Sequence, residues 1–514
     1  MQQTGNRRPG RVWFAQKNIA FGYIGQAATS LMSFILRTIF IMNLSEELLG
    51  VNSLYTNILS ILSMAELGIG TALNFALYKP VAEEDTEKIK SYMQMYRRAY
   101  RTIAVVVAVI GLCIAPFLPY LIKDPGEITV SEMTLYYFIF LFNTVSTYFV
   151  SYKYSLCNAE QRNYIQTNIN TLTKIVTTAL QILVVIVTKN FLLYLLTDML
   201  VQLTQKIFVS RYLNHLYPYL QDKNVQPLSK EESGEVWRKT KALVMHKIGD
   251  VARLQTDSLI ISSFIAVAVS GMVDNYNMVI NAVTNFVNIL LNSVISGFGN
   301  LIATEDREHQ FRLFKVYRFF ANWVYGFLVT GFYVLLTPLI RIWLGDAWVL
   351  SSAAVTLILV DLYFKGERIV LSNYKTAAGV FEQDRYLALI QGGVNLVLSI
   401  GLVQVIGLPG IYVGTVVSGL IANITKPFII YKVCFDRTCG AYFIDSLKYA
   451  GVTLAIALGL RLAGEAVFGS YTILTFLLMA VIITLVYNGV FALLFGRGEE
   501  FGYLKGIVMR KLRR

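Results

Sequence analysis

The sequence predicts an all-α membrane protein built from a duplicated unit. Hydrophobic residues make up 55% of the 514 residues and charged residues only 15%, well below the quarter that is typical of soluble domains. Apolar stretches of about 20 residues or more recur along the whole length, each long enough to cross a hydrocarbon core roughly 30 Å thick. We therefore expect a polytopic protein with about fourteen transmembrane helices.

Two windows of the sequence recur further along the chain, in the same direction. Tyr152, Lys153, Glu160, Gln161 and Tyr164 return 222 positions later as Tyr374, Lys375, Glu382, Gln383 and Tyr386. At an offset of 221, Glu84, Asp85, Glu87, Tyr96 and Arg97 return as Glu305, Asp306, Glu308, Tyr317 and Arg318. Chance would give about one identity per window. The agreement indicates a duplication, which in a membrane protein is typical of a transporter.

The expected spans divide evenly between the two copies. They cover residues 19 to 43, 50 to 77, 99 to 122, 131 to 153, 165 to 188, 190 to 211, 242 to 268, 272 to 301, 316 to 343, 350 to 374, 386 to 406, 409 to 431, 443 to 467 and 470 to 495. Each copy holds six spans, so both enter the membrane from the same side and the repeat is parallel. We expect two six-helix lobes, 19–212 and 242–432, around a central cavity.

The remaining segments are a linker and two additions. Residues 213–241 are expected to form a cytoplasmic linker between the lobes, and two further helices lie within 443–495. Lys and Arg are abundant in residues 1–18, in the second connection and in the tail 496–514, whereas the alternate connections offer only Lys123, Lys189 and Arg341. The positive-inside rule then places both termini and the basic loops in the cytoplasm.

The same charge distribution and the motif content argue against several functions. The net charge of +13 is mostly a topology signal, so nucleic-acid binding is not expected. The four cysteines have no metal-ligand spacing and the three histidines are scattered, so we expect no metal and no cofactor. Nucleotide-binding and hydrolase motifs are missing from the sequence. The chain is not expected to be an enzyme.

Polar residues inside the spans are the candidates for a substrate site, because an ionisable group in hydrocarbon costs several kcal/mol and normally faces a cavity or a partner. They follow helical periodicity. The first span carries a stripe of Gln26, Ser30, Ser33 and Arg37, and the fifth span contains Lys174. The other candidates are Arg253, Asn281, Asn288, Lys365 and Arg368.

Each stripe also has a structural interpretation. The amides of the eighth span, which include Asn281 and Asn288, fit interhelical hydrogen bonds equally well. Arg253 has carboxylates three and four residues away, and Lys365 and Arg368 follow Asp361, so intrahelical ion pairs would explain them too. Arg37 differs because its own helix contains no carboxylate. Its partner must lie on another helix or on a substrate.

Three carboxylates at membrane depth, Glu66, Asp198 and Asp257, are candidates for coupling transport to a proton or sodium gradient. Guanidinium and ammonium groups suit phosphate oxygens, whereas amides and hydroxyls suit sugar hydroxyls. A cavity that combines both fits a glycan attached to a phosphate. The opposing carboxylates leave open whether such a cavity is net cationic.

Several segments resemble a known family. They are FILRTIF at 34–40, LGVNSLY at 49–55, AELGIGTA at 65–72 and Tyr78-Lys79-Pro80, with TDSLIIS at 256–262 and GNLIA at 299–303 in the second lobe. With these segments the chain resembles bacterial polysaccharide flippases of the Wzx type. These belong to the multidrug/oligosaccharidyl-lipid/polysaccharide (MOP) exporter superfamily, which also contains the MATE antiporters and the lipid II flippase.

The resemblance implies a flippase of the bacterial inner membrane that moves undecaprenyl-diphosphate-linked oligosaccharide from the cytoplasmic to the outer leaflet by alternating access. It implies that Arg37 and Arg253 meet the diphosphate. Membrane lipids and glycan polymerase machinery would be its partners. The alternatives are a MATE-type multidrug or cation antiporter and, from another class, a membrane glycan polymerase or ligase. The short external loops argue against the enzyme, and the two extra spans argue against the antiporter.

Overall fold

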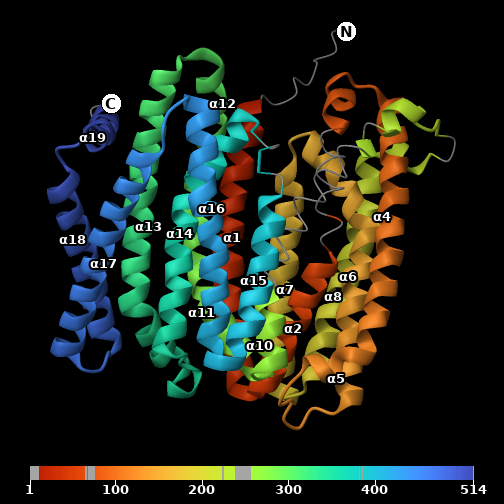
Figure 1. The fold of residues 1–514 in the computed structure, drawn as a ribbon. Coiled ribbons are helices and arrows are strands. Elements are labelled where there is room, and N and C mark those ends of the chain that lie inside the picture. Colours follow the sequence, from red (N-terminus) through yellow and green to blue (C-terminus); the bar gives the residue numbers. More distant parts are fainter. Residues whose placement is uncertain are drawn as a thin grey trace. The chain divides into compact units, whose positions relative to one another are not determined.

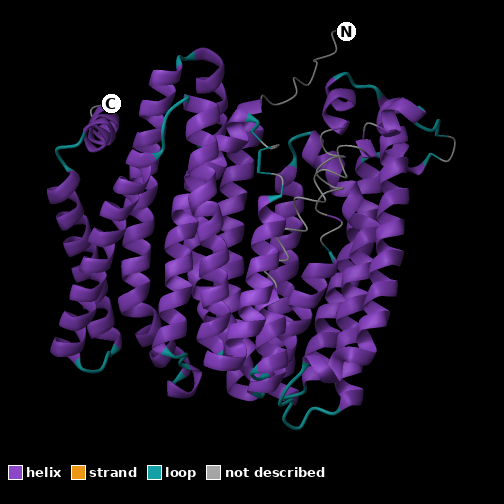
Figure 2. Cartoon of the chain, viewed as in Figure 1, coloured by secondary structure: helices purple, strands orange, loops and turns teal. Residues whose placement is uncertain are grey.

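The computed structural model describes residues 11–63, 66, 76–222, 225–234, 236–237, 256–380, 383–384 and 386–512. Every regular element in this part of the chain is a helix (Figure 2), which confirms the expected all-α class. The chain divides into two compact units, Met1–Gly271 and Met272–Arg514. The division falls inside one helix, so the first unit extends beyond the linker that the sequence predicts.

The first unit contains a bundle of long helices (Figure 1). These are α1 (Arg11–Asn43), α2 (Glu46–Leu62), α4 (Thr86–Ile114, continued by a 3-10 turn and the short α5, Leu118–Leu121), α6 (Val130–Ala159), α7 (Asn163–Thr188), α8 (Phe191–Leu216) and α10 (Thr256–Phe264). Helix α1 packs on α7, α4 packs on α6, and α8 contacts both α6 and α7. Helices α1, α6, α7 and α8 therefore pack as one connected group.

Glycines set the closest approaches in this unit. A β-carbon on Gly50 of α2 would lie 2.0 Å from the Val267 carbonyl oxygen, and one on Gly25 of α1 would lie 2.6 Å from the Thr171 hydroxyl of α7. Only a glycine permits backbones to approach this closely. The contact at Gly50 explains why the compact unit reaches Gly271, because α10 and the start of the next helix pack on α2.

The second unit is also helical. Its elements are α11 (Val267–Asn292, which begins in the first unit), α12 (Ile295–Thr304), α13 (Arg307–Leu344), α14 (Ser352–Ala378), α15 (Leu387–Ile406), α16 (Leu408–Phe435), α17 (Gly440–Phe468), α18 (Ile473–Phe495) and α19 (Glu499–Leu512). Helix α14 packs between α13 and α16, and α15 packs on α16. Helix α19 lies across the end of α18 rather than continuing it (Figure 1).

The two added helices α17 and α18 are fixed to α13 by an aromatic cluster. Phe319 of α13 and Tyr487 and Phe491 of α18 are almost completely buried, together with Met479 and Ile483. The rings of Trp323 and Phe491 stack with centroids 5.4 Å apart. Aromatic pairs of this kind add about 0.5–1.5 kcal/mol beyond the area they bury. The addition is thus a packed part of the second unit.

The repeated residues prove to be structural. Asp85 accepts a hydrogen bond from the Lys88 amide at 3.0 Å and caps α4, and its counterpart Asp306 accepts from the His309 amide at 2.7 Å and caps α13. Both caps satisfy backbone donors that a helix leaves open at its amino end. The duplicated sequence therefore marks where each long helix begins.

The repeated lysine is also a structural link in both units. Lys153 is buried and its ammonium donates to the Ser210 hydroxyl and to the Asn214 side chain, both at 2.8 Å, which ties α6 to α8. Its counterpart Lys375 forms an ion pair with Asp384. Buried ammonium groups need such partners, since an uncompensated charge is costly.

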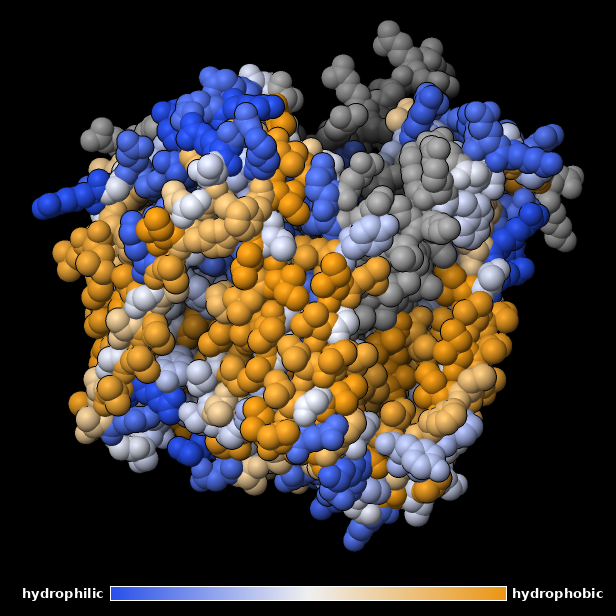
Figure 3. Space-filling model, viewed as in Figure 1, coloured by the Kyte–Doolittle hydropathy of each residue, from blue (hydrophilic) through white to orange (hydrophobic). Residues whose placement is uncertain are grey.

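Eleven described helices are long and apolar enough to cross a membrane. Three of the fourteen expected spans are not among them. Residues 50–77 and 242–268 fall partly outside the described residues, and α14 carries five charged side chains along its length. On the face drawn in Figure 3, hydrophobic side chains cover the middle of the helices and hydrophilic ones gather at their ends. The chain is a multi-pass membrane protein.

Candidate functional site

The polar stripe of the first helix lies at the α1–α7 contact. Gln26 donates to the Ser30 hydroxyl at 3.2 Å, one turn further along. Gln26, Ser30, Ser33 and Arg37 are all half-buried, whereas Ile24, Leu31 and Ile35 on the opposite face are exposed. The stripe therefore faces the interior of the first unit, as the helical spacing predicts.

Arg37 and Lys174 lie close together. Lys174 of α7 is half-buried and within electrostatic range of both Arg37 and Asp198 of α8. The Tyr194 hydroxyl, one turn before Asp198, is also within range of Arg37. Asp198 is in turn within electrostatic range of two cations, Lys174 of α7 and Lys206 of α8. Three residues that the sequence singled out separately, two as substrate ligands and one as an ion-coupling group, belong to one cluster.

Asn143 of α6 completes this cluster. Its side-chain amide donates to Asp198 at 2.9 Å, and its backbone carbonyl accepts from the Lys206 ammonium at 2.8 Å. Lys206 also donates to the Ser146 hydroxyl at 2.8 Å. The Asn143 side-chain oxygen is buried and accepts no hydrogen bond from the described residues. We call Arg37, Asn143, Lys174, Asp198 and Lys206 the polar cluster.

The sequence did not single out Asn143 or Lys206. Lys206 follows Asp198 by eight residues, close to two helical turns, so it projects from nearly the same face of α8. That spacing was the available signal. The sequence around Asn143 contains no comparable signal, because the span is mostly apolar and no charged residue lies one or two helical turns from this amide. Only the packing of α6 on α8 brings it to the carboxylate.

Glu66 occupies a different environment. The residue is half-buried, and two tyrosines, Tyr100 of α4 and Tyr148 of α6, lie within its electrostatic range. No cation of the described residues influences it. Most neighbours of Glu66 in sequence lie outside the described part of the chain. Asp257, the third ion-coupling candidate, stands in the first turn of α10 and is half-buried.

The asparagine side chains of α11 lie in two different environments. Asn281 is exposed. Asn288 accepts a hydrogen bond from the Tyr325 hydroxyl of α13 at 2.6 Å, and Asn292 one turn later accepts from Asn373 of α14 at 3.1 Å. These contacts are those of interhelical links, the alternative interpretation of this stripe. Asn281 keeps its polar groups available.

Lys365 and Arg368 meet the carboxylate that precedes them. The Lys365 ammonium lies 2.8 Å from Asp361 and the Arg368 guanidinium 3.3 Å from it. Arg368 also donates to the Gly419 carbonyl at 3.0 Å and to the Asn423 side chain at 2.9 Å. Arg368 is therefore a buried link between α14 and α16. Lys365 has an exposed head group, with 45% of its side chain accessible. Arg253 lies outside the described residues.

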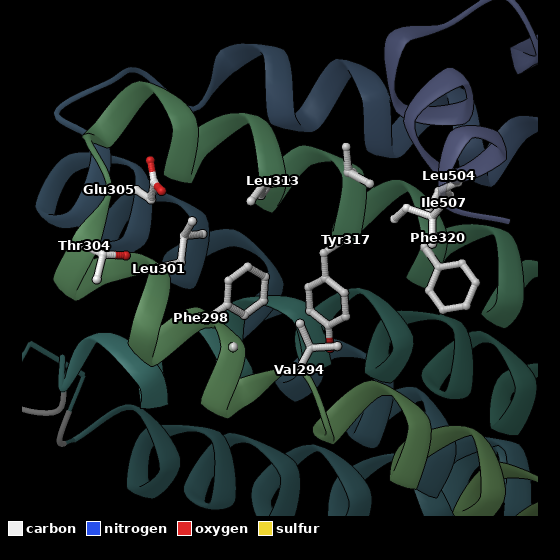
Figure 4. A pocket seen from close by; sticks show the side chains of 12 residues that line it. Val294, Phe298, Leu301, Thr304, Glu305, Leu313, Tyr317, Phe320, Leu504 and Ile507 are labelled. Atoms are coloured by element: carbon white, nitrogen blue, oxygen red, sulfur yellow. The ribbon is translucent and has the colours of Figure 1, made fainter. Parts of the chain in front are cut away.

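An apolar cavity lies in the second unit. It has a volume of about 430 Å³ and lies between α12, α13 and α19. In Figure 4 the rings of Phe298 and Tyr317 and the side chains of Leu301 and Leu313 line it, with Leu504 of α19 at one end. Among the described residues that line it, Glu305 carries the one carboxylate, and Thr304 and Tyr317 contribute hydroxyls. This lining suits hydrocarbon and does not suit an anion or a sugar.

Comparisons with known proteins identify the fold. Residues 23–183 match the MatE family model, while no curated protein matches the chain. Among solved structures, an inward closed conformation of the lipid II flippase MurJ superposes with a TM-score of 0.67 at 13% identity, over 93% of this chain and all of that one. An inward-facing MATE multidrug transporter of the MOP superfamily gives 0.60 at 14% identity, over 78% of this chain and 94% of that one. The Vibrio cholerae MATE transporter VcmN gives 0.55 at 15% identity, over 83% and 99%.

Proposed function

We propose that this chain, a multi-pass membrane protein of the MOP superfamily, is a flippase for a lipid-linked oligosaccharide whose carrier is a polyprenyl diphosphate. The cations of the polar cluster hold the diphosphate, and the side-chain amide of Asn143 holds the first sugar. Headgroup and carrier cross the membrane by alternating access, with the hydrocarbon tail remaining in the bilayer. The resident chemistry is binding, and no bond of the substrate is made or broken.

The polar cluster is the observation that carries this proposal. Its three cations, Arg37, Lys174 and Lys206, exceed its single carboxylate Asp198. An arginine and two ammonium groups within one cluster suit the oxygens of a diphosphate, which accept several charge-assisted hydrogen bonds. The buried oxygen of Asn143 offers an acceptor for a sugar hydroxyl. A cationic drug would be repelled by the same excess of positive charge.

The presence of helices α17 and α18 also supports the flippase proposal. The MurJ structure covers 93% of this chain, whereas the two MATE structures cover 78% and 83%. The more extensive match is thus to a lipid II flippase. A soluble substrate needs no surface for a hydrocarbon tail, but a lipid carrier does.

Reconstituted protein tests the proposal. Proteoliposomes would contain a fluorescent undecaprenyl-diphosphate-linked oligosaccharide, and a membrane-impermeant quencher would report its movement between leaflets. Arg37→Gln and Lys174→Gln are expected to slow this movement at least about tenfold, the cost of one charge-assisted hydrogen bond. Arg341→Gln is the matched control, because Arg341 is exposed and pairs with Asp346 outside the cluster. Wild-type rates in both cluster variants would refute the proposal.

A MATE-type antiporter is the second candidate. The MatE match over residues 23–183 and the carboxylate Glu66 between two tyrosines favour it, since a carboxylate without a cation suits reversible protonation. Drug susceptibility of a deletion strain distinguishes the two. Increased sensitivity to cationic drugs with an unchanged pool of lipid-linked glycan supports the antiporter. Accumulation of completed lipid-linked repeat units supports the flippase.

Ion coupling is tested on the same vesicles. We expect Glu66→Gln to abolish the response of transport to an imposed proton gradient. Transport by the wild type that ignores both proton and sodium gradients would contradict coupling without touching the flippase proposal.

A further inference from the structure

A pocket with a mixed polar and apolar lining lies in the first unit, and none of its lining residues belongs to the polar cluster. It has a volume of about 380 Å³ and is formed by one face of α4 and by Pro227, Leu228, Ser233 and Trp237 of the inter-lobe linker. Ser91, Arg98 and Thr102 of α4 line one side, and Ser233 and Trp237 of the linker line the other. The proposed function does not use this pocket.

The depth of Arg98 in the membrane follows from the length of the helix. The apolar helix that contains α4 and α5 runs from Thr86 to Leu121 over 36 residues. A helix needs about 20 residues to cross the hydrocarbon core. If Leu121 is one end of the embedded part, the other end lies at about residue 102. Arg98 therefore stands at the height of the lipid headgroups. Trp237, half exposed at 50%, is a residue type that favours the same level.

The charge of this surface suits an anion. Arg97, Arg98 and Arg101 are all exposed on α4. Among the described residues, no carboxylate forms an ion pair with Arg98. The nearby carboxylate Glu232 is already held by Lys88 at 3.4 Å, and its pKa is kept below the usual value mainly by hydrogen bonds from Ser229. The guanidinium of Arg98 thus faces the pocket with its donors available.

An apolar track continues from the pocket along the same helix face. Thr102, Val105 and Val109 follow Arg98 at spacings of four, seven and eleven residues, which places them on one stripe. Val105 is 63% exposed and Val109 is 53% exposed. A ligand that combines a phosphate with a hydrocarbon chain would lie along this stripe, its charge at Arg98 and its chain toward Val109.

We propose that this pocket binds the phosphodiester headgroup of an anionic phospholipid of the surrounding bilayer. Arg98 neutralises the phosphate, the Ser233 hydroxyl on the opposite side of the pocket is a further donor, and one acyl chain covers the apolar stripe of α4. The linker is held beside the site by the pair Lys90–Asp222 at 2.6 Å and by the Ser91 hydroxyl, which donates to the Gln226 carbonyl at 2.6 Å. The bound lipid would fasten the linker to the membrane surface.

Native mass spectrometry of the full chain in detergent tests this inference. The protein would be titrated with phosphatidylglycerol and, separately, with phosphatidylcholine, which carries no net charge. We expect wild-type protein to retain phosphatidylglycerol in preference, and Arg98→Gln to weaken that retention about tenfold. Arg211→Gln is the control, since it removes an exposed positive charge on α8 outside the pocket and should bind as the wild type does.

Three outcomes would overturn the inference. Equal loss of phosphatidylglycerol in the Arg98 and Arg211 variants would indicate attraction by general surface charge. Equal retention of the two lipids by the wild type would remove the role of the anionic headgroup. Displacement of the lipid by millimolar inorganic phosphate would make the pocket a site for soluble anions. None of these outcomes affects the transport measurement that tests the proposed function, so the two proposals can fail independently.

Discussion

At the scale of single residues, two interior lysines are each held by a specific set of acceptors. Lys153 is bound by Ser210 and Asn214, and Lys206 by Asn143 and Ser146. An ammonium group taken out of water needs several such contacts to offset its desolvation. The polar cluster combines this structural bonding with an excess of positive charge, and Asn143 links its carboxylate to one of its cations.

Lys206→Met tests how much the hydrogen bonds of Lys206 contribute to the stability of the folded protein. The substitution keeps the length of the side chain but removes donors to Asn143 and Ser146, and it leaves Asp198 with less positive charge nearby. We expect thermal unfolding in detergent at a lower temperature, corresponding to a loss of about 1–3 kcal/mol. Lys189→Met is the control, because Lys189 is exposed at the end of α7. Equal melting temperatures for the two variants would argue against a structural role for Lys206.

At the scale of elements, glycines and one arginine determine how the helices of the second unit pack. A β-carbon on Gly366 of α14 would lie 2.2 Å from the ring of Tyr325 of α13, whereas one on Gly331 of α13 would meet nothing within 4 Å. We expect Gly366→Ala to destabilise the protein by about 1–3 kcal/mol through overpacking. Gly331→Ala should have no such effect, because both sites are helical and only one is crowded. Thermal melting of both variants checks this contrast.

Arg318 shows how one repeated residue serves different purposes in the two copies. Its guanidinium donates to the Tyr442 carbonyl at 2.7 Å and to the Ser446 hydroxyl at 2.6 Å, and it stacks on the Tyr442 ring at 3.7 Å. It is also within electrostatic range of the buried Glu367. Its counterpart Arg97 is exposed. The second copy uses this position to attach α17.

Arg318→Gln is expected to loosen that attachment. Removal of the guanidinium deletes its hydrogen bonds to the Tyr442 carbonyl and the Ser446 hydroxyl, which join α13 to α17. Losing a hydrogen bond from a charged donor costs about 1.5–3 kcal/mol. We expect limited proteolysis to cut the loop between α16 and α17 faster than in the wild type. Arg312→Gln, on an exposed position of the same helix, is the control. Identical cleavage rates in the two variants would contradict the role assigned to Arg318.

At the scale of the whole molecule, the distribution of Lys and Arg predicts that both termini and the linker are cytoplasmic. Single cysteines would be introduced in a background without the four native ones. A membrane-impermeant maleimide applied to intact cells is expected to label Ser470→Cys in the α17–α18 loop and to spare Ser229→Cys in the linker. Both positions are exposed, so accessibility differs only by side. The opposite pattern would reverse the topology.

The sequence by itself determined the membrane class, the helical fold and the duplication. Apolar stretches of sufficient length leave a helix as the natural way to satisfy backbone hydrogen bonds in lipid, and the repeated Asp85 and Asp306 encode the start of a long helix in each copy. The stripe that contains Arg37 was also predictable, because helical periodicity alone decides which residues share a face.

Only the tertiary structure decided which polar residues meet. Arg368 could have faced a substrate, but the approach of α16 gives it Gly419 and Asn423. Lys174 and Asp198 come from different helices, as do Asn143 and Lys206. Spacing along one helix reports a shared face, whereas contact between helices depends on how side chains of distant segments interlock. That is why the candidates were visible in the sequence and the polar cluster was not.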